Sequence, residues 1–292
     1  DANMMDNSAM YRALSNNDQK ADHALTTPRK YDDPTTKELG VHEIESAIDF
    51  MEKQFGRKFD WDAFIRHCEA TNQVNREEME RWDIYCKTDN GCLNAICQGM
   101  YRIYFYQQGG TKYFAKSSAK TLKLMYECVE KNIKPFPNTR HRALAWSCGS
   151  TYYCHGVGWL YNCWGILAVI NMGSLTGHNL IDTEDRETMM EDLADWYSHT
   201  PMRTHTVGGN RHIMQMGETA EKFNCDTIIM YDDIGCKGMA GAQGLLEEEF
   251  AKHRDKFHII WMPHSLMDCR IVPTNEARRA VNQYMTDVLH EE

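Results

Sequence analysis

The sequence lacks the features that mark several classes of protein. No Cys-x-x-Cys pair occurs among its 11 cysteines, which removes the usual zinc-finger and thioredoxin interpretations. No apolar run approaches the roughly 20 residues that span a membrane, and no signal-peptide pattern opens the chain. The net charge of −10 is the opposite of what binding to nucleic acid through bulk electrostatics requires. We therefore expect neither a membrane nor a nucleic-acid partner.

The cysteines that are present are not spaced like a disulfide framework, and a chain of 292 residues does not need one. Free thiols in this number indicate a reducing environment. We therefore expect a cytoplasmic protein, and an anaerobic cytoplasm is consistent with this composition.

The first part of the chain is polar and then helical. Residues 1–40 have no strong apolar period and are expected to be irregular with at most one short helix, whereas residues 41–137 are predicted to form a helical linking region. Gly56 is placed to end one helix of this region, and Asp60 is placed to begin the next. The first helix is expected to bury Ile44, Ile48, Met51 and Phe55. The second is expected to carry a charged face with Glu77, Glu78, Glu80 and Arg81, and further helices are predicted at 93–107 and 115–131.

Residues 138–292 alternate short apolar runs with helical patterns. Strands separated by helices form a parallel sheet that is covered on both faces. This part is therefore predicted to be a flavodoxin-like, doubly wound α/β domain of about four strands. The predicted strands are 142–146, 166–170, 227–230 and 257–262, and the predicted helices are 153–164, 183–199, 208–223, 240–254 and 274–289.

Cys236 is the main candidate for chemistry. It follows the strand at 227–230 and precedes the next helix, which is where open α/β sheets place their sites. The amides at the start of that helix and the Lys237 side chain would both favour a thiolate. A thiolate is what an iron–sulfur cluster requires, although a buried and inert cysteine is the common alternative.

Two other strand ends carry polar side chains. The turn 147–151 is rich in glycine and hydroxyl groups and could bind an anion such as a phosphate of coenzyme A. Its candidate substrate contacts are Ser147, Cys148 and Ser150. After the last strand, Asp268 and Arg270 could pair with each other and hold the loop, and this structural role is the favoured interpretation.

These residues resemble a known family. The run Tyr231–Lys237, followed by Gln243, is similar to the third-cysteine motif of the 2-hydroxyacyl-CoA dehydratase / benzoyl-CoA reductase family. That family continues with an Asp-x-x-Asp-x-Arg pattern, of which Asp268 and Arg270 are present here, while Ser265 replaces the first acid. The resemblance extends from about residue 41 and implies a chain that corresponds to the carboxyl-terminal two-thirds of such a subunit, without its N-terminal domain, or a divergent member without the usual ligand set.

The resemblance implies an iron–sulfur subunit of an (R)-2-hydroxyacyl-CoA dehydratase, a lyase. A [4Fe-4S] cluster would be held by Cys236, with Lys237, Gln243, Asp268 and Arg270 around it. In such enzymes one electron reduces the thioester carbonyl to a ketyl radical anion, hydroxide leaves, and the 2-enoyl-CoA forms as the electron is recycled. The implied partners are a homologous second subunit, an ATP-dependent activator that donates the electron, and the acyl-CoA substrate.

Other functions stay open at this point. A benzoyl-CoA reductase subunit would use the same electron injection to reduce an aromatic ring. A non-catalytic scaffold or electron-relay subunit is an alternative of another class, since no cysteine precedes Cys68. A flavin-binding module is a weaker third possibility, because the sequence has no recognisable flavin-phosphate loop.

Overall fold

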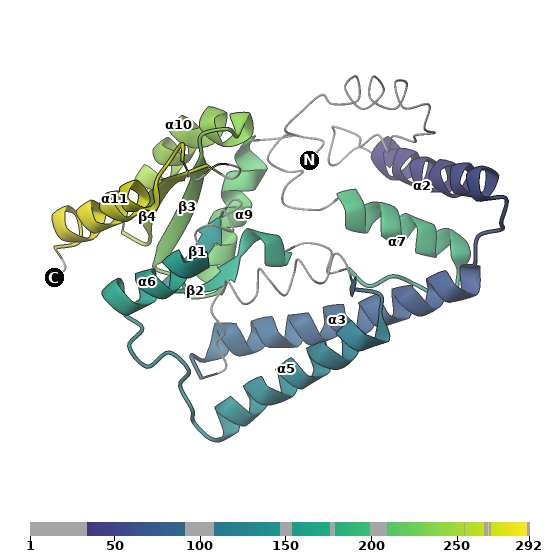
Figure 1. Ribbon diagram of the computed structural model, residues 1–292, viewed down its shortest axis with the longest axis horizontal. Helices are drawn as coiled ribbons and strands as arrows, with labels where there is room; N and C mark the ends of the chain where they lie inside the picture. The colour runs from purple at the N-terminus through teal and green to yellow at the C-terminus, as the bar shows by residue number, and fades with distance from the viewer. Residues whose placement is uncertain are drawn as a thin grey trace.

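A computed structural model describes residues 34–90, 108–146, 154–175, 179–198, 209–253, 255–265, 268 and 270–290. Long helices occupy one part of the molecule, and a parallel sheet with its covering helices occupies the other (Figure 1). No helix within these ranges combines the length and the apolar character needed to cross a membrane.

The helices of the first part end and begin at capping residues. Their bounds are Pro34–Phe55 (α2), Trp61–Lys87 (α3) and Lys112–Glu130 (α5). Gly56 has a φ of 62°, a value that favours glycine, and it ends α2 as predicted. The Asp60 side chain accepts a hydrogen bond from the Ala63 amide at 2.8 Å, so its predicted role at the start of α3 is confirmed. The helix predicted at 93–107 lies outside the described residues.

Helix α2 corrects the expected start of the helical region. It begins at Pro34 rather than near residue 41, so residues 34–40 are helical and not irregular. Proline is favourable at the first position of a helix, because that position needs no amide donor. Gly40 lies within α2 where the helix packs closely on α7 (Arg186–Ser198). A Cβ atom on Gly40 would lie 3.0 Å from the Ala194 Cβ, so glycine allows this close approach.

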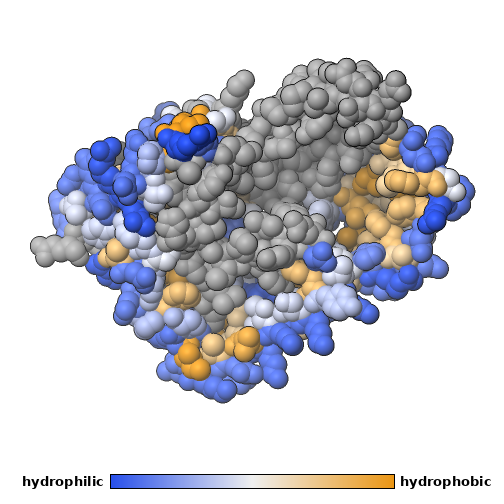
Figure 2. All heavy atoms as spheres, viewed as in Figure 1, coloured by the Kyte–Doolittle hydropathy of each residue, from blue (hydrophilic) through white to orange (hydrophobic). Residues whose placement is uncertain are grey.

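The predicted apolar stripe of α2 is wrong at its carboxyl-terminal end. Ile48 is buried, but the exposed fractions of Met51 and Phe55 are 39% and 74%. Helical spacing identifies a shared face, whereas burial depends on how far the neighbouring helix extends along that face. Apolar side chains are visible on the surface over α2 and α7 (Figure 2).

The second part is a parallel sheet with the order β2-β1-β3-β4. The strands are His141–Trp146 (β1), Ile166–Asn171 (β2), Thr227–Asp233 (β3) and His258–His264 (β4). The helices between and after them are Cys154–Trp164 (α6), Arg186–Ser198 (α7), Gly209–Lys222 (α9), Lys237–Ala251 (α10) and Thr274–Asp287 (α11), and a short 3₁₀ turn spans Met172–Leu175 (η2). All strands are parallel. After β1 the chain adds β2 on one side and then β3 and β4 on the other, so the order of strands reverses between β1 and β3, as in flavodoxin-like folds. The predicted fold class is confirmed.

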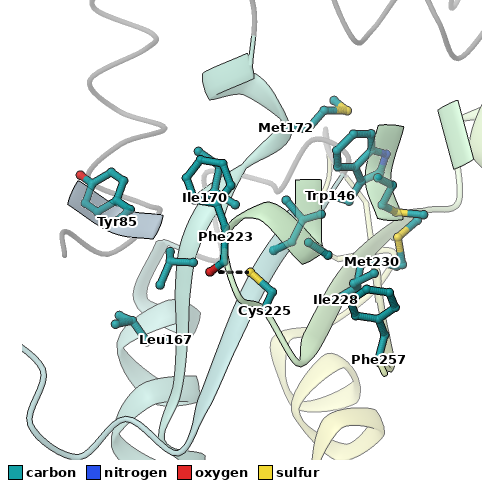
Figure 3. Close-up of a cluster of buried hydrophobic side chains, with 14 of the residues drawn as sticks. Tyr85, Trp146, Leu167, Ile170, Met172, Phe223, Cys225, Ile228, Met230 and Phe257 are labelled. Atoms are coloured by element: carbon teal, nitrogen blue, oxygen red, sulfur yellow. Dashed lines mark hydrogen bonds between the residues drawn. The ribbon is translucent and has the colours of Figure 1, made fainter. Parts of the chain in front are cut away.

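Helices cover both faces of the sheet. On the α6–α11 face, Leu160 and Trp164 of α6 and Val281 of α11 pack against alternate residues of the strands. On the α9–α10 face, the apolar cluster shown in Figure 3 joins strand residues such as Leu167 and Ile228 to helix residues. Successive side chains of each strand point to opposite faces, so the nearly continuous apolar runs contribute to two separate cores, as expected for a doubly wound sheet.

The helical part shares the core of the α9–α10 face. Tyr85 of α3 and Met125 of α5 belong to the same cluster as Trp146 of β1 and Phe223 (Figure 3). Cys225 is also part of this cluster, with its thiol 3.9 Å from the Phe223 carbonyl oxygen. The long helices are thus packed against the sheet by buried side chains, and Cys225 is a packing residue.

The charged face predicted on α3 is partly wrong. Glu78 and Arg81 are buried, with exposed fractions of 4% and 3%, and they form an ion pair. Arg81 also donates to the Ser118 hydroxyl of α5 at 3.0 Å. The pair lies where α3 packs on α5, so the neighbouring helix covers what the sequence alone places in water.

Arg142 joins the start of β1 to the ends of two helices. Its guanidinium donates to the Tyr85 carbonyl oxygen of α3 at 2.7 Å and to the Phe223 carbonyl oxygen, just after α9, at 3.0 Å. It also pairs with Asp89, which follows α3. These contacts connect the helical part to the amino-terminal edge of the sheet.

Candidate functional site

The candidate site lies at the carboxyl ends of β1 and β3, which we call the switch-point edge. These strands are neighbours, and Trp146 at the end of β1 pairs with Met230 of β3. Their exposed fractions are 0% and 1%, so both side chains are buried in the apolar core next to this edge. Open α/β sheets bind ligands where the strand order reverses.

Strand β3 extends further than predicted. It ends at Asp233 rather than Met230, because the ladder to β4 continues until Asp233 pairs with His264. The polar residues after the apolar run therefore still belong to the strand. After the two turn residues Ile234 and Gly235, Cys236 is the N-cap of α10, which begins at Lys237 and not at Ala240.

Hydrogen bonds fix the turn that carries Cys236. The Ile234 amide donates to the His264 carbonyl oxygen at 3.2 Å, and the Cys236 amide donates to the Asp233 carbonyl oxygen at 2.9 Å. The Gly235 amide donates to the Asp233 carboxylate oxygen Oδ1 at 3.2 Å. The amides of this turn are thus directed to acceptors on β3 and β4, and the Cys236 side chain makes no capping hydrogen bond.

Buried polar residues lie beside this turn, at the end of β4 and directly after it. His264 and Ser265 have exposed fractions of 0% and 5%, and the rings of His264 and Tyr231 are 5.6 Å apart. His264 therefore packs against the end of β3 from the neighbouring strand. The sequence pattern after the last strand points to Asp268 and Arg270, but it carries no signal for the burial of His264.

Asp232 and Asp233 differ in their surroundings, although they are adjacent. Successive residues of a strand point to opposite faces of a sheet. Burial raises the pKa of the Asp232 carboxyl; interaction with His264 opposes this rise. The negative charges of Asp233 and Glu247 raise the pKa of Asp232 further. The carboxyl end of β3 therefore holds two adjacent carboxyl groups whose negative charges repel each other.

Asp268 and Arg270 form the pair that the sequence suggested. The Arg270 guanidinium donates to both carboxylate oxygens of Asp268, with a shortest distance of 2.6 Å. The Asp268 Oδ1 atom also accepts from the Arg270 amide at 2.9 Å, and the Asp268 amide lies 3.3 Å from the Ser265 hydroxyl. The side chains of Arg270 and Asp268 are 87% and 28% exposed, so the pair lies at the surface after β4.

The remaining predicted residues are not assembled around Cys236 in the described part. Gln243 lies about 10 Å further along the axis of α10, and its amide contacts Glu247 at 3.2 Å. Lys237 opens α10, but its side chain lies outside the described part. Ser147, Cys148 and Ser150 also lie outside the described residues.

Asp233 is the functional candidate that sequence analysis missed. An aspartate two residues before a glycine is a common turn pattern, because its carboxylate can accept a hydrogen bond from the amide two residues on. The sequence Asp233-Ile234-Gly235 has this pattern. The pattern could have been recognised, but the burial of Asp233 at 7% exposure could not.

The fold and this edge define an α/β protein with a parallel sheet and a candidate site at its switch point. The chain belongs to the family described as 2-hydroxyglutaryl-CoA dehydratase, D-component, whose model matches residues 5–263. The family predicted from the motifs is thereby confirmed, and the chain is a member of a family of dehydratase components that work with partner subunits. The match begins before residue 41 and ends before Asp268 and Arg270. A search of the curated proteins finds no match.

Cys68 is expected to be chemically inert, in contrast to an exposed cysteine. Burial raises the pKa of the Cys68 thiol to about 11, and the Glu69 charge adds to the rise. Roughly 100-fold less thiolate than for an ordinary cysteine is expected at neutral pH. In the folded protein, iodoacetamide should label exposed Cys163 at least tenfold faster than Cys68, as followed by peptide mass spectrometry. Equal labelling rates under native conditions would show that Cys68 is accessible.

Proposed function

We propose that this chain is the iron–sulfur subunit of an (R)-2-hydroxyacyl-CoA dehydratase, which removes water from a 2-hydroxyacyl-CoA. Membership of the dehydratase family supports the reaction class. The observation that carries the site is the position of Cys236, half-buried at the start of α10 and at the switch-point edge.

Cys236 has the chemistry that a [4Fe-4S] cluster needs from one of its ligands. Such clusters are held by cysteine thiolates, and the Cys236 side chain makes no capping hydrogen bond that would compete for its sulfur. No group of three or more metal-ligating side chains occurs within the described ranges. We therefore propose that further ligands come from other parts of this chain or from a partner subunit.

When bound, a cluster supplies single-electron chemistry and a Lewis-acidic iron near the substrate oxygen. In the proposed arrangement this chain's own residues hold and shield that site. Cys236 provides a sulfur ligand from a hydrogen-bonded turn, and Trp146 and Met230 keep water from the sheet side. We propose that Lys237, the neighbour of Cys236 in the sequence, would tune the charge of the bound cluster.

We propose that the remaining predicted residues act around this centre. Ser147, Cys148 and Ser150 follow β1 in the sequence and would contact the acyl-CoA, since β1 is the neighbour of β3. The Asp268–Arg270 pair would support the loop that borders the site, and Gln243 would act from a later turn of α10. The proposed partners are a homologous second subunit and an ATP-dependent activator that donates the electron.

The proposal is tested by the iron and acid-labile sulfide content of the complete complex, purified under strict anaerobiosis. About four iron atoms per chain are expected for wild type and none at this position for Cys236→Ala, because removal of a thiolate ligand disrupts the cluster. Cys163→Ala, a change at an exposed cysteine of α6, is the matched control and should retain wild-type iron. Wild-type complex without iron, or iron retained in Cys236→Ala, would contradict the proposed ligand.

Turnover by the same preparations separates the alternatives. The family description names a dehydratase, and this favours 2-hydroxyacyl-CoA over benzoyl-CoA as the substrate. Conversion of benzoyl-CoA alone would identify the reductase alternative. Full turnover and assembly in Cys236→Ala would identify a non-catalytic scaffold or relay subunit.

A further inference from the structure

Asp233 holds the turn before Cys236 through its side chain as well as its backbone. Its carboxylate oxygen accepts the Gly235 amide, and its carbonyl oxygen accepts the Cys236 amide. A hydrogen bond to a charged acceptor is stronger than one between neutral groups. Two successive positions of the turn are therefore tied to a single residue.

The backbone that carries this carboxylate is held in place by the neighbouring strand, and Asp233 is buried. Asp233 pairs in register with His264, and only 7% of Asp233 is exposed. The His264 carbonyl oxygen accepts the Ile234 amide, so β4 supports the same turn from the other side. A side chain fixed in this way can hold the turn in one shape before any ligand arrives.

The turn does not require the conformational freedom of glycine at Gly235. Gly235 is not among the residues with positive φ. A Cβ atom on Gly235 would lie 3.6 Å from the Asp233 Oδ1 atom, which is an ordinary contact distance. The turn thus tolerates a side chain at Gly235 provided that its amide still reaches Asp233.

From these contacts we propose that Asp233 is a positioning residue for Cys236, which presents the thiol at the switch-point edge in the geometry needed to ligate iron. This inference rests on the proposed function for the role of Cys236. The positioning itself concerns hydrogen bonds within this chain. It can therefore be tested in metal-free protein, apart from any cluster.

The first test is amide hydrogen exchange across residues 233–237 of the metal-free full chain. Asp233→Ala should speed exchange there by about tenfold or more, because the Gly235 amide loses its charged acceptor. Asp233→Asn retains an acceptor oxygen but not its charge, so its exchange should lie between that of wild type and that of Asp233→Ala, and closer to wild type. Gly235→Ala and Asp232→Ala are matched controls within the same segment and should resemble wild type. Equal exchange in Asp233→Ala and Asp233→Asn would overturn the proposal.

The second test is the iron content of the same variants in the anaerobic complex. Asp233→Ala should lose most of its iron, and Asp233→Asn should retain it. If Asp233→Ala does not fold, Asp233→Ser takes its place, since a hydroxyl forms this turn more weakly and should give intermediate exchange. Exchange in Asp233→Ser equal to wild type would then overturn the positioning role. If the exchange result holds but wild type has no iron, the positioning stands and the iron-ligand role of Cys236 fails.

Discussion

Glu78→Ala is expected to lower the free energy of unfolding by about 3–5 kcal/mol, because it leaves the buried Arg81 without its carboxylate partner. The Ser118 hydroxyl would remain as an acceptor, but it carries no charge to compensate the guanidinium. A buried charge without a partner costs far more than the loss of an exposed pair. Urea unfolding of the full chain, followed by circular dichroism, measures the change.

An exposed ion pair on the same helix provides the control for this prediction. Asp83 and Lys87 of α3 lie 3.8 Å apart, and their side chains are 69% and 75% exposed. Asp83→Ala should therefore change the free energy of unfolding by no more than about 0.5 kcal/mol. Equal losses in the two variants would mean that Glu78 and Arg81 are not paired in a buried environment.

A double replacement separates burial of charge from loss of packing. Glu78→Leu combined with Arg81→Met removes both charges and keeps much of the apolar volume between α3 and α5. It should recover a large part of the stability lost in Glu78→Ala, since buried ion pairs can often be replaced by apolar side chains. A double variant that is less stable than Glu78→Ala would contradict this explanation.

Arg142→Ala is expected to cost about 2–4 kcal/mol of unfolding free energy. The change leaves the carbonyl oxygens of Tyr85 and Phe223 without this donor at the junction of α3, α9 and β1. Each buried acceptor that loses its partner costs about 1–3 kcal/mol. The loss should also weaken the packing of the helical part on the sheet, because Asp89 loses its cationic partner as well.

The same unfolding measurement compares Arg142→Ala with two other variants. Arg140→Ala changes a neighbouring arginine that is exposed, and it should stay within about 0.5 kcal/mol of wild type. Arg142→Lys should fall between the two, since a single ammonium cannot reproduce the planar fork that reaches both helix ends. If Arg142→Lys were as stable as wild type, charge alone would account for the role of Arg142.

The sequence by itself determined the elements and the class of fold. Local signals located α3 through Asp60 and ended α2 at Gly56, and both caps are seen. Alternating apolar runs and helical patterns predicted a parallel, doubly covered sheet, which the structure shows. The same order placed Cys236 after a strand and at the start of a helix. These features depend on neighbours in the chain, so the sequence contains the information directly.

Tertiary structure alone decided which polar groups are buried and what they contact. Glu78 and Arg81 have the pattern of a solvated helix face and become buried because α5 covers them. Strand β3 continues through Asp233 because β4 offers a partner, and the burial of Asp233 makes its carboxylate a fixed support for Cys236. Arg142 contacts carbonyl groups that lie 57 and 81 residues away in the chain. Such contacts arise from the packing of distant segments, for which no local pattern of residues carries a signal.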